Sequence, residues 1–350
     1  MVVSGRNGAA PVLVRAARGE KTPHTPVWFM RQAGRYLPEY RAIRETHSLL
    51  EICARPELAA EVTLQPLRRF AADAAIIFAD ILLPVIPMGL SLRFAAGEGP
   101  VIDPPVRDAA GARALSAVDV DDALASTLDA IRLVRGELDA ETAVVGFAGA
   151  PFTIASYMIE GGASRSFVET KRMMYSDPEA WDTLMRRITS TVAGFLAAQV
   201  RAGADVVQVF DSWVGALSPD DYRRYVLPYS SEVLRAAEAT GAPVIHFGAG
   251  TATLLELMTE AGGDVIGLDW RVPLNEGWAR IGGCAVQGNL DPIALFAPRD
   301  ELARRVDDIL ARAGNRPGHL FNVGHGLVPN TDPAAVRFVV DRVHERSARQ

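Results

Sequence analysis

The chain has 350 residues, of which 49% are hydrophobic and 22% charged, and its formal net charge is −6. This composition is typical of globular proteins with enough apolar material for a sizeable core, so it excludes disorder of the whole chain. Lys and Arg form no dense block, so the charge pattern indicates neither nucleic acid nor an anionic membrane as a partner.

The first 20 residues are expected to be flexible and to precede a single domain that spans residues 21–350. A short apolar stretch at residues 11–14 is followed by Arg15 and Arg18, which is not the pattern of a secretory signal peptide. One large α/β domain can account for the remaining length, because barrels often exceed about 200 residues.

The hydrophobic runs and the cysteines indicate a soluble, cytoplasmic protein. The longest later run without a charge, residues 81–92, contains two prolines and is too short to span a bilayer. The two cysteines, Cys53 and Cys284, lie far apart in the sequence. They indicate neither a disulfide framework nor a Cys-rich zinc site.

Short, β-branched apolar runs recur along the chain, with helix-like stretches between them. Such continuous runs are typical of parallel strands buried on both faces of a sheet. The expected strands are residues 74–78, 143–147, 205–210, 243–247, 264–268, 284–287 and 319–323, with residues 27–30 as a weaker eighth candidate. Helices are expected at residues 178–202 and 219–240, which end near Gly203 and Gly241.

The alternation of strands and helices predicts a (β/α)8 TIM barrel. An open doubly wound sheet is less favoured, because the chain has neither a Gly-x-Gly-x-x-Gly run after its first strand nor a Gly-Lys-Ser/Thr loop. Residues 89–111 interrupt the alternation and are expected to be an insertion with a hairpin through residues 90–94. This insertion could cover a pocket or form a subunit contact.

Polar residues or glycines follow nearly all of the expected strands. A single polar residue after a strand is usually a turn or a helix cap. In a barrel, however, the carboxyl ends of the strands form one rim around an active-site cleft. The rim residues expected here are Asp80, Gly149-Ala150-Pro151, Asp211-Ser212, His246, Asp269, Gln287-Gly288-Asn289 and His325.

Arg31 and Arg35 lie four residues apart in an aromatic and apolar stretch. Gly34 between them lets the chain turn, so both guanidinium groups can face the same space. Two planar guanidinium groups are suited to two carboxylates. In the alternative, the arginines lie on a solvated face and pair with Glu39 and Glu45.

Asp80 is embedded in hydrophobic sequence at the end of an expected strand. An ionised carboxylate in such surroundings needs hydrogen-bond donors or a cation. It could cap the helix that follows. It could also accept from several N–H donors or serve as the counter-charge of a cationic intermediate.

Three further side chains are candidates for hydrogen bonding at the rim. Tyr157 could place its hydroxyl there or pack in the core. Ser212 lacks a Gly-x-Ser-x-Gly elbow, which favours a hydrogen-bonding role over nucleophilic catalysis. His325 lies between Gly324 and Gly326, where a backbone or a ligand can approach closely, although a lone histidine is often structural.

Taken together, these segments resemble the uroporphyrinogen decarboxylase family over residues 26–333. The resemblance rests, in chain order, on WFMRQAGRYLPEY at residues 28–40, FADIL at 78–82, GAPFT at 149–153, QGNLDP at 287–292 and GHG at 324–326. It implies a barrel that uses no metal or organic cofactor and converts the four acetate side chains of uroporphyrinogen III to methyls. The product is coproporphyrinogen III, on the way to haem, and the implied assembly is a homodimer.

The resemblance also implies roles for individual residues. Arg31 and Arg35 would hold substrate carboxylates, the backbone of Gln32, Ala33 and Gly34 would shape the pocket, and Tyr157, Ser212 and His325 would form hydrogen bonds. Asp80 would face the pyrrole N–H groups and act catalytically by stabilising a cation. The identity of the proton donor is left open, because an arginine stays protonated near neutral pH.

Two alternatives remain at this point. A cobalamin-related zinc methyltransferase of the same fold would need zinc held by His and Cys, yet residues 246–248 read His-Phe-Gly rather than His-x-Cys. A non-catalytic tetrapyrrole-binding protein would keep the pocket without the reaction, and the presence of Asp80 argues against it.

Overall fold

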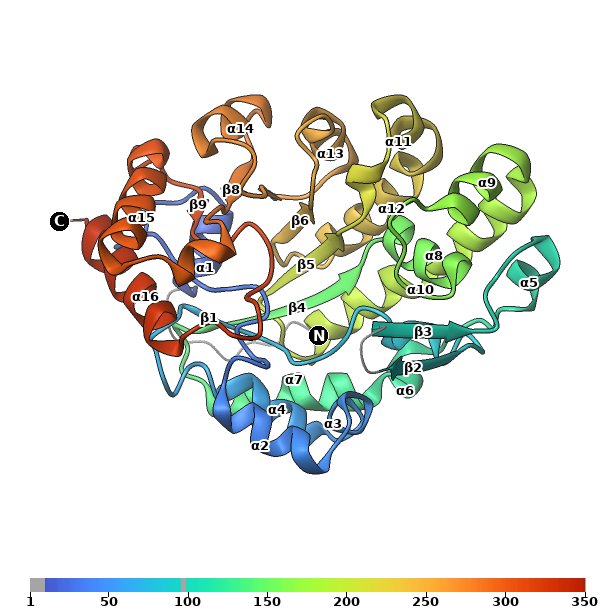
Figure 1. Ribbon diagram of the computed structural model, residues 1–350, viewed down its shortest axis with the longest axis horizontal. Helices are drawn as coiled ribbons and strands as arrows, with labels where there is room; N and C mark the ends of the chain where they lie inside the picture. The colour runs from blue at the N-terminus through green and yellow to red at the C-terminus, as the bar shows by residue number, and fades with distance from the viewer. Residues whose placement is uncertain (1–9, 96–98, 350) are drawn as a thin grey trace.

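The computed structural model describes residues 10–95 and 99–349, and its centre is one curled parallel sheet with helices around the outside (Figure 1). Neighbouring strands pair in the order β1-β4-β5-β6-β7-β8-β9, and every pair is parallel. The strands are β1 (Ala74–Ile76), β4 (Ala143–Gly149), β5 (Val206–Asp211), β6 (Val244–Gly248), β7 (Val265–Gly267), β8 (Ala285–Gln287) and β9 (His319–Leu320). All seven firmly expected strands are therefore present.

The segment around Val27 fills the gap between β9 and β1. Val27 forms a parallel bridge with Phe321, whose N–H donates to the Pro26 carbonyl at 2.8 Å. On the other side, the N–H of Asp73 donates to the Val27 carbonyl at 2.9 Å. The weaker eighth candidate thus closes the TIM barrel as a bridge rather than a full strand. The chain turns away directly afterwards, at Arg31, whose φ is 62°.

The helices alternate with the strands as a (β/α)8 barrel requires. They are α1 (Val12–Ala17), α2 (Pro38–Thr46), α3 (Leu49–Cys53), α4 (Pro56–Leu64), α5 (Ala109–Ala114), α6 (Val120–Ala123), α7 (Ala125–Glu137), α8 (Pro151–Glu160), α9 (Val168–Ser176), α10 (Pro178–Ala202), α11 (Pro219–Tyr225), α12 (Leu227–Glu238), α13 (Leu255–Ala261), α14 (Leu274–Arg280), α15 (Arg299–Ala313) and α16 (Pro333–Ser347). Short 3₁₀ turns are η1 (Leu83–Val85), η2 (Val214–Ala216) and η3 (Pro292–Phe296). Among the described residues, no helix is long and apolar enough to cross a membrane.

Helix α10 matches its expected bounds because its ends are specified locally. The Asp177 side chain accepts from the N–H of Ala180, and Gly203 ends the helix at φ 121°. The helix expected at residues 219–240 is instead divided into α11 and α12. Pro228 explains the division, because a proline has no N–H to donate and belongs in a first helical turn.

The beginning of the chain differs from the expected flexible segment over residues 1–20. Residues 12–17 form α1, in which Leu13 and Ala16 are buried, and α1 packs against β9. Residues 1–9 lie outside the described residues. The apolar stretch at residues 11–14 is therefore part of the packed fold and lies against β9.

The expected insertion forms an antiparallel hairpin of β2 (Ser91–Ala95) and β3 (Gly99–Asp103). It is attached to the end of α8, since the N–H of Ile102 donates to Gly161 O and the N–H of Val106 donates to Met158 O, each at 2.9 Å. Because α8 also contains Tyr157, the insertion lies beside the candidate site described next.

Candidate active site

Asp80 lies after β1, on the rim formed by the carboxyl ends of the strands, and its side chain is half-buried. Its Oδ1 accepts from the N–H of Leu82 at 2.9 Å, so it does cap the turn that follows. Among the described residues, the second oxygen, Oδ2, has no hydrogen-bond donor. Burial raises the pKa of Asp80, although the hydrogen bond from the Leu82 N–H and the charge of Arg31 act to lower it. One carboxylate oxygen is therefore free to accept a hydrogen bond from a ligand.

Arg31 is exposed and has an unusual backbone conformation, with φ in the left-handed region. The turn is held by its neighbours: the N–H of Met30 donates to Asn322 Oδ1 at 3.0 Å, and that of Leu327 donates to Met30 O at 2.9 Å. A non-glycine residue adopts this conformation only where the surroundings enforce it. The enforced turn fixes where the Arg31 guanidinium can reach.

Gln32, Ala33 and Gly34 form the tight turn between the two arginines. The Gln32 side chain is fully buried; its Nε2 donates to Ala74 O at 2.7 Å and its Oε1 accepts from the N–H of Phe29 at 3.0 Å. Ala33 is buried and Gly34 half-buried. Gln32 thus anchors the turn to β1. Ala33 and Gly34 have no polar side chains, so they can offer a ligand only their backbone groups.

The ion pairs weighed as an alternative for the two arginines do not form. Glu39 instead accepts from Arg69 Nε at 2.9 Å. Arg35 is exposed, as Arg31 is. Within residues 10–95 and 99–349, neither Arg31 nor Arg35 has a carboxylate partner. Both guanidinium groups are available to an anionic ligand.

The electrostatic effects of these groups on one another show that four of the candidates are neighbours. Burial and the charge of Asp80 raise the pKa of Tyr157 to about 12, with Arg31 acting in the opposite direction. Burial and the charge of Arg31 lower the pKa of His325. Arg31, Asp80, Tyr157 and His325 therefore share one environment, although they are distant in sequence.

Ser212 and Tyr157 are brought to the same wall of the site by Thr153, which sequence reasoning did not single out. Thr153 Oγ1 donates to Asp211 Oδ1 at 3.2 Å and accepts from the N–H of Trp213 at 3.4 Å. The Trp213 ring lies 3.8 Å from that of Tyr157, centroid to centroid. The residues on both sides of Ser212 are thereby fixed to α8, and Ser212 itself is half-buried.

Two further residues of the rim, Trp270 and Arg271, were also missed. The Arg271 guanidinium lies 4.0 Å above the Trp270 ring and 2.7 Å from buried Asp269, and Trp270 forms an edge contact with His325. Their position directly after the β7 strand was the available signal. Arg271 adds a positive charge close to His325 and lowers its pKa further.

The two glycines beside His325 are required by close approaches. A Cβ at Gly324 would lie 2.4 Å from the backbone nitrogen of Trp270. A Cβ at Gly326 would lie 2.4 Å from Arg31 Cδ. His325 Nδ1 accepts from the N–H of Gly326 at 2.8 Å. The loop after β9 thus packs directly against the arginine turn after Val27.

His246, where a zinc methyltransferase of this fold would require a ligand, is fully buried. Its Nδ1 lies 3.3 Å from Met258 O and its Nε2 3.9 Å from Asp211 Oδ2. Cys53 is buried. Cys284, which directly precedes β8, contacts Gly263 O at the amino-terminal end of the barrel. In the described ranges, neither cysteine belongs to a group of three residues able to hold a metal.

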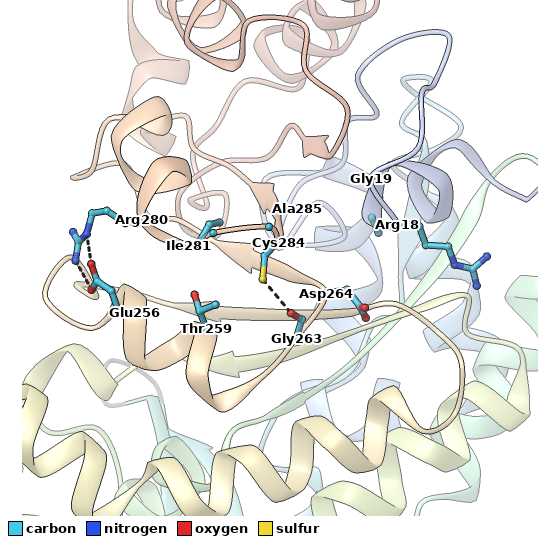
Figure 2. A pocket seen from close by; sticks show the side chains of 13 residues that line it. Arg18, Gly19, Glu256, Thr259, Gly263, Asp264, Arg280, Ile281, Cys284 and Ala285 are labelled. Atoms are coloured by element: carbon cyan, nitrogen blue, oxygen red, sulfur yellow. Dashed lines mark hydrogen bonds and ion pairs between the residues drawn. The ribbon is translucent and has the colours of Figure 1, made fainter.

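A cavity of about 560 Å³ lies at the amino-terminal end of the barrel, away from these residues (Figure 2). Asp264 and Cys284, which directly precede β7 and β8, line it. Of the charged residues that line it, Arg280 and Glu256 are paired with each other at 2.7 Å. None of the predicted site residues lines this cavity, so it is not part of the rim site.

Comparison with known proteins matches residues 10–346 to the family model described as uroporphyrinogen decarboxylase (URO-D). A uroporphyrinogen decarboxylase from Sorangium cellulosum is 58% identical over 332 residues, covering 95% of each chain. One from Carboxydothermus hydrogenoformans is 51% identical over 336 residues, covering 96% of each. A solved methyltransferase from Methanosarcina mazei, at 20% identity, shares the fold with a TM-score of 0.79, covering 95% of this chain and 97% of that one. The chain belongs to the uroporphyrinogen decarboxylase family.

Proposed function

We propose that the protein is a carboxy-lyase that removes the carboxyl groups from the four acetate side chains of uroporphyrinogen III and yields coproporphyrinogen III. The observation that carries the proposal is that, among the described residues, Asp80 Oδ2 accepts no hydrogen bond and Arg31, whose charge acts on Asp80, forms no ion pair. A neutral pyrrole ring with acetate side chains offers an N–H donor to Asp80 and a carboxylate to Arg31. Family membership supports the same reaction.

Arg31 and Arg35 bind substrate carboxylates in this proposal. Both are exposed and unpaired among the described residues, and a guanidinium can bind a carboxylate through two parallel hydrogen bonds. The backbone of Gln32, Ala33 and Gly34 shapes the pocket between them. Because the arginine turn is anchored to β1 through Gln32, the bound acetate is held near Asp80 rather than in free solution.

Asp80 stabilises the charge that forms during the reaction. Protonation of a pyrrole carbon beside an acetate makes a delocalised cation, and the electrons of the breaking C–C bond then flow into that ring as CO₂ leaves. A proton adds to the exocyclic carbon, giving the methyl, and the ring proton is lost, so each acetate consumes one proton and releases one CO₂. The ring is its own electron sink, so no cofactor is required.

Tyr157, Ser212 and His325 provide the remaining hydrogen bonds. With a pKa of about 12, Tyr157 keeps its proton at neutral pH and is a donor. His325 has a lowered pKa, so it is neutral there. Since its Nδ1 already accepts from Gly326, its single proton lies on Nε2, which is therefore a donor.

The proposed assembly is a cytoplasmic homodimer, and the proposed ligand is the tetrapyrrole rather than a nucleic acid or a membrane. The family resemblance supports the dimer. Light scattering on the purified protein tests it: the expected mass is twice 37.6 kDa, and a mass of one chain at micromolar concentration would contradict it.

Replacement of Asp80 by Asn tests the proposed chemistry. The variant is expected to fold and to bind uroporphyrinogen but not to decarboxylate it under anaerobic, reducing conditions. Asp332→Asn is a matched control, since Asp332 also accepts from an N–H two residues on, at 2.8 Å, but caps α16. Near-normal turnover by Asp80→Asn would refute the role of Asp80. Tight binding without turnover by the wild-type protein would favour a carrier.

A further inference from the structure

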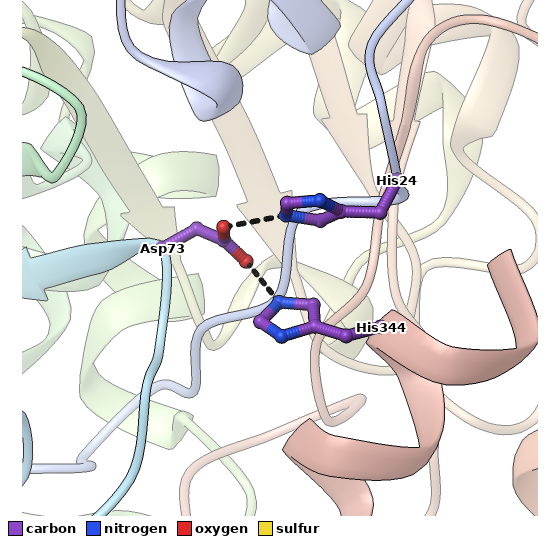
Figure 3. Close-up of side chains that lie close together, drawn as sticks. All are labelled: His24, Asp73 and His344. Carbon is purple, nitrogen blue, oxygen red and sulfur yellow. Dashed lines mark hydrogen bonds and ion pairs between the residues drawn. The ribbon is translucent and has the colours of Figure 1, made fainter. Parts of the chain in front are cut away.

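Three side chains from distant parts of the chain meet at the end of the barrel opposite Asp80 (Figure 3). Asp73 directly precedes β1, His24 precedes the Val27 segment, and His344 lies in the last turn of α16. His24 Nε2 is 2.8 Å from Asp73 Oδ1, and His344 Nε2 is 2.8 Å from Asp73 Oδ2. One ligand atom from each residue lies within 4.8 Å of the other two.

The arrangement has the features of a metal site rather than of a single hydrogen bond. Both imidazole rings direct Nε2 at the same carboxylate, and their centroids are only 4.3 Å apart. The exposed fractions of the side chains of His24, His344 and Asp73 are 25%, 26% and 11%, so an ion can enter from solvent. The Val27 N–H holds Asp73 Oδ2 at 2.7 Å, an outer contact that orients a carboxylate ligand.

The tautomers of the two histidines also suit a cation. Each oxygen of the Asp73 carboxylate lies 2.8 Å from one imidazole Nε2. A neutral imidazole that gives up its Nε2 hydrogen bond can move its proton to Nδ1. The freed Nε2 lone pair then faces the same space as the carboxylate oxygens.

We propose that His24, Asp73 and His344 bind one divalent cation of the zinc type. Two imidazole nitrogens and a carboxylate favour zinc over magnesium or calcium, which prefer oxygen ligands. The ion joins the amino-terminal segment, the start of β1 and the carboxyl-terminal helix, residues separated by up to 320 positions in the sequence (344 − 24). It stabilises the closed barrel and takes no part in decarboxylation, so the inference does not depend on the proposed function.

Zinc titration of the chelator-stripped protein against a chromophoric competitor tests the site. The wild type is expected to bind one zinc per chain, and His24→Gln and His344→Gln are each expected to bind it at least about 100-fold more weakly, since even an outer contact contributes 10–100-fold. His47→Gln is the control, because His47 is a half-exposed histidine elsewhere in the chain. Decarboxylation by the wild type is expected to be equal with and without zinc.

Thermal unfolding and X-ray absorption keep the test decisive if a variant folds poorly. Zinc at a hundred times its Kd is expected to raise the wild-type Tm by about 4 °C, and the absorption spectrum is expected to show two imidazole ligands and no sulfur. Three results would overturn the proposal: no zinc bound by the wild type, equal binding by His24→Gln and His344→Gln, or a sulfur ligand from Cys53 or Cys284.

Discussion

The contact between Gly326 and Arg31 gives the sharpest test of how the site is assembled. A Cβ at position 326 would lie 2.4 Å from Arg31 Cδ, 2.7 Å from Cγ and 2.9 Å from Nε. Ordinary contacts of a Cβ begin at 3.4 Å, so the stem of Arg31 must retreat by 3.4 − 2.4 = 1.0 Å or more. A displacement of about 1 Å can cost on the order of 100-fold in rate.

Gly326→Ala is therefore expected to lower kcat/KM for uroporphyrinogen by about 100-fold. In the proposed mechanism Arg31 binds a substrate carboxylate, so part of the loss is expected to be a higher KM. The fold is expected to tolerate the change, because the displaced atoms belong to an exposed, flexible side chain; we expect Tm to change by less than about 2 °C. Steady-state assays with chromatographic separation of the oxidised porphyrins measure both parameters.

Two comparisons decide whether the effect passes through Arg31. Gly136→Ala introduces a Cβ into open space in α7 and is expected to be as active as the wild type. In a double-mutant cycle, Gly326→Ala should add little to the effect of Arg31→Ala. Without the Arg31 side chain, the new Cβ has no atoms of residue 31 to displace. Unchanged kcat/KM in Gly326→Ala, or full additivity with Arg31→Ala, would show the reasoning to be wrong.

Three further predictions follow from single contacts. Since burial raises the pKa of Asp80, its protonated form stabilises the fold at low pH, and this contribution is lost as pH rises through the raised pKa. Asp80→Asn should thus melt above the wild type at pH 8, with the difference shrinking toward pH 4; equal Tm at both would contradict this. Tyr157→Phe should lose about 10-fold in kcat/KM, as expected for one hydrogen bond, with Tm unchanged; a lower Tm with normal kinetics would indicate a structural role. Gly215→Ala, whose Cβ would lie 2.3 Å from Ala249 O, should lower the free energy of unfolding in urea by about 1–3 kcal/mol, and wild-type stability would contradict the backbone clash.

The strands could be predicted because a strand that is buried on both faces has a continuous apolar sequence. A parallel strand inside a barrel needs an unbroken apolar run, and each of the seven firm predictions coincides with a strand. The Val27 segment was only a weak candidate, since it pairs through a single bridge. Helix α1 was missed because its short apolar stretch gains its burial from β9, far along the chain.

The site could be predicted only in part, because its geometry depends on contacts between distant segments. Position after a strand identified Asp80 and Ser212 as rim residues. It could not show that the Arg31 side chain packs against Gly326, nor that Thr153 forms hydrogen bonds to both neighbours of Ser212. Arg31 and Gly326 are 295 residues apart (326 − 31), so no local pattern connects them.

The central claim concerns bond breaking at the four acetates, and product analysis tests it directly. Purified wild-type protein would be incubated anaerobically with uroporphyrinogen III, and the oxidised products would be analysed by mass spectrometry over time. The account predicts the successive loss of four carboxyl groups without added metal or organic cofactor, ending at coproporphyrin III. Bound but unchanged substrate, or a dependence on an added cofactor, would contradict it.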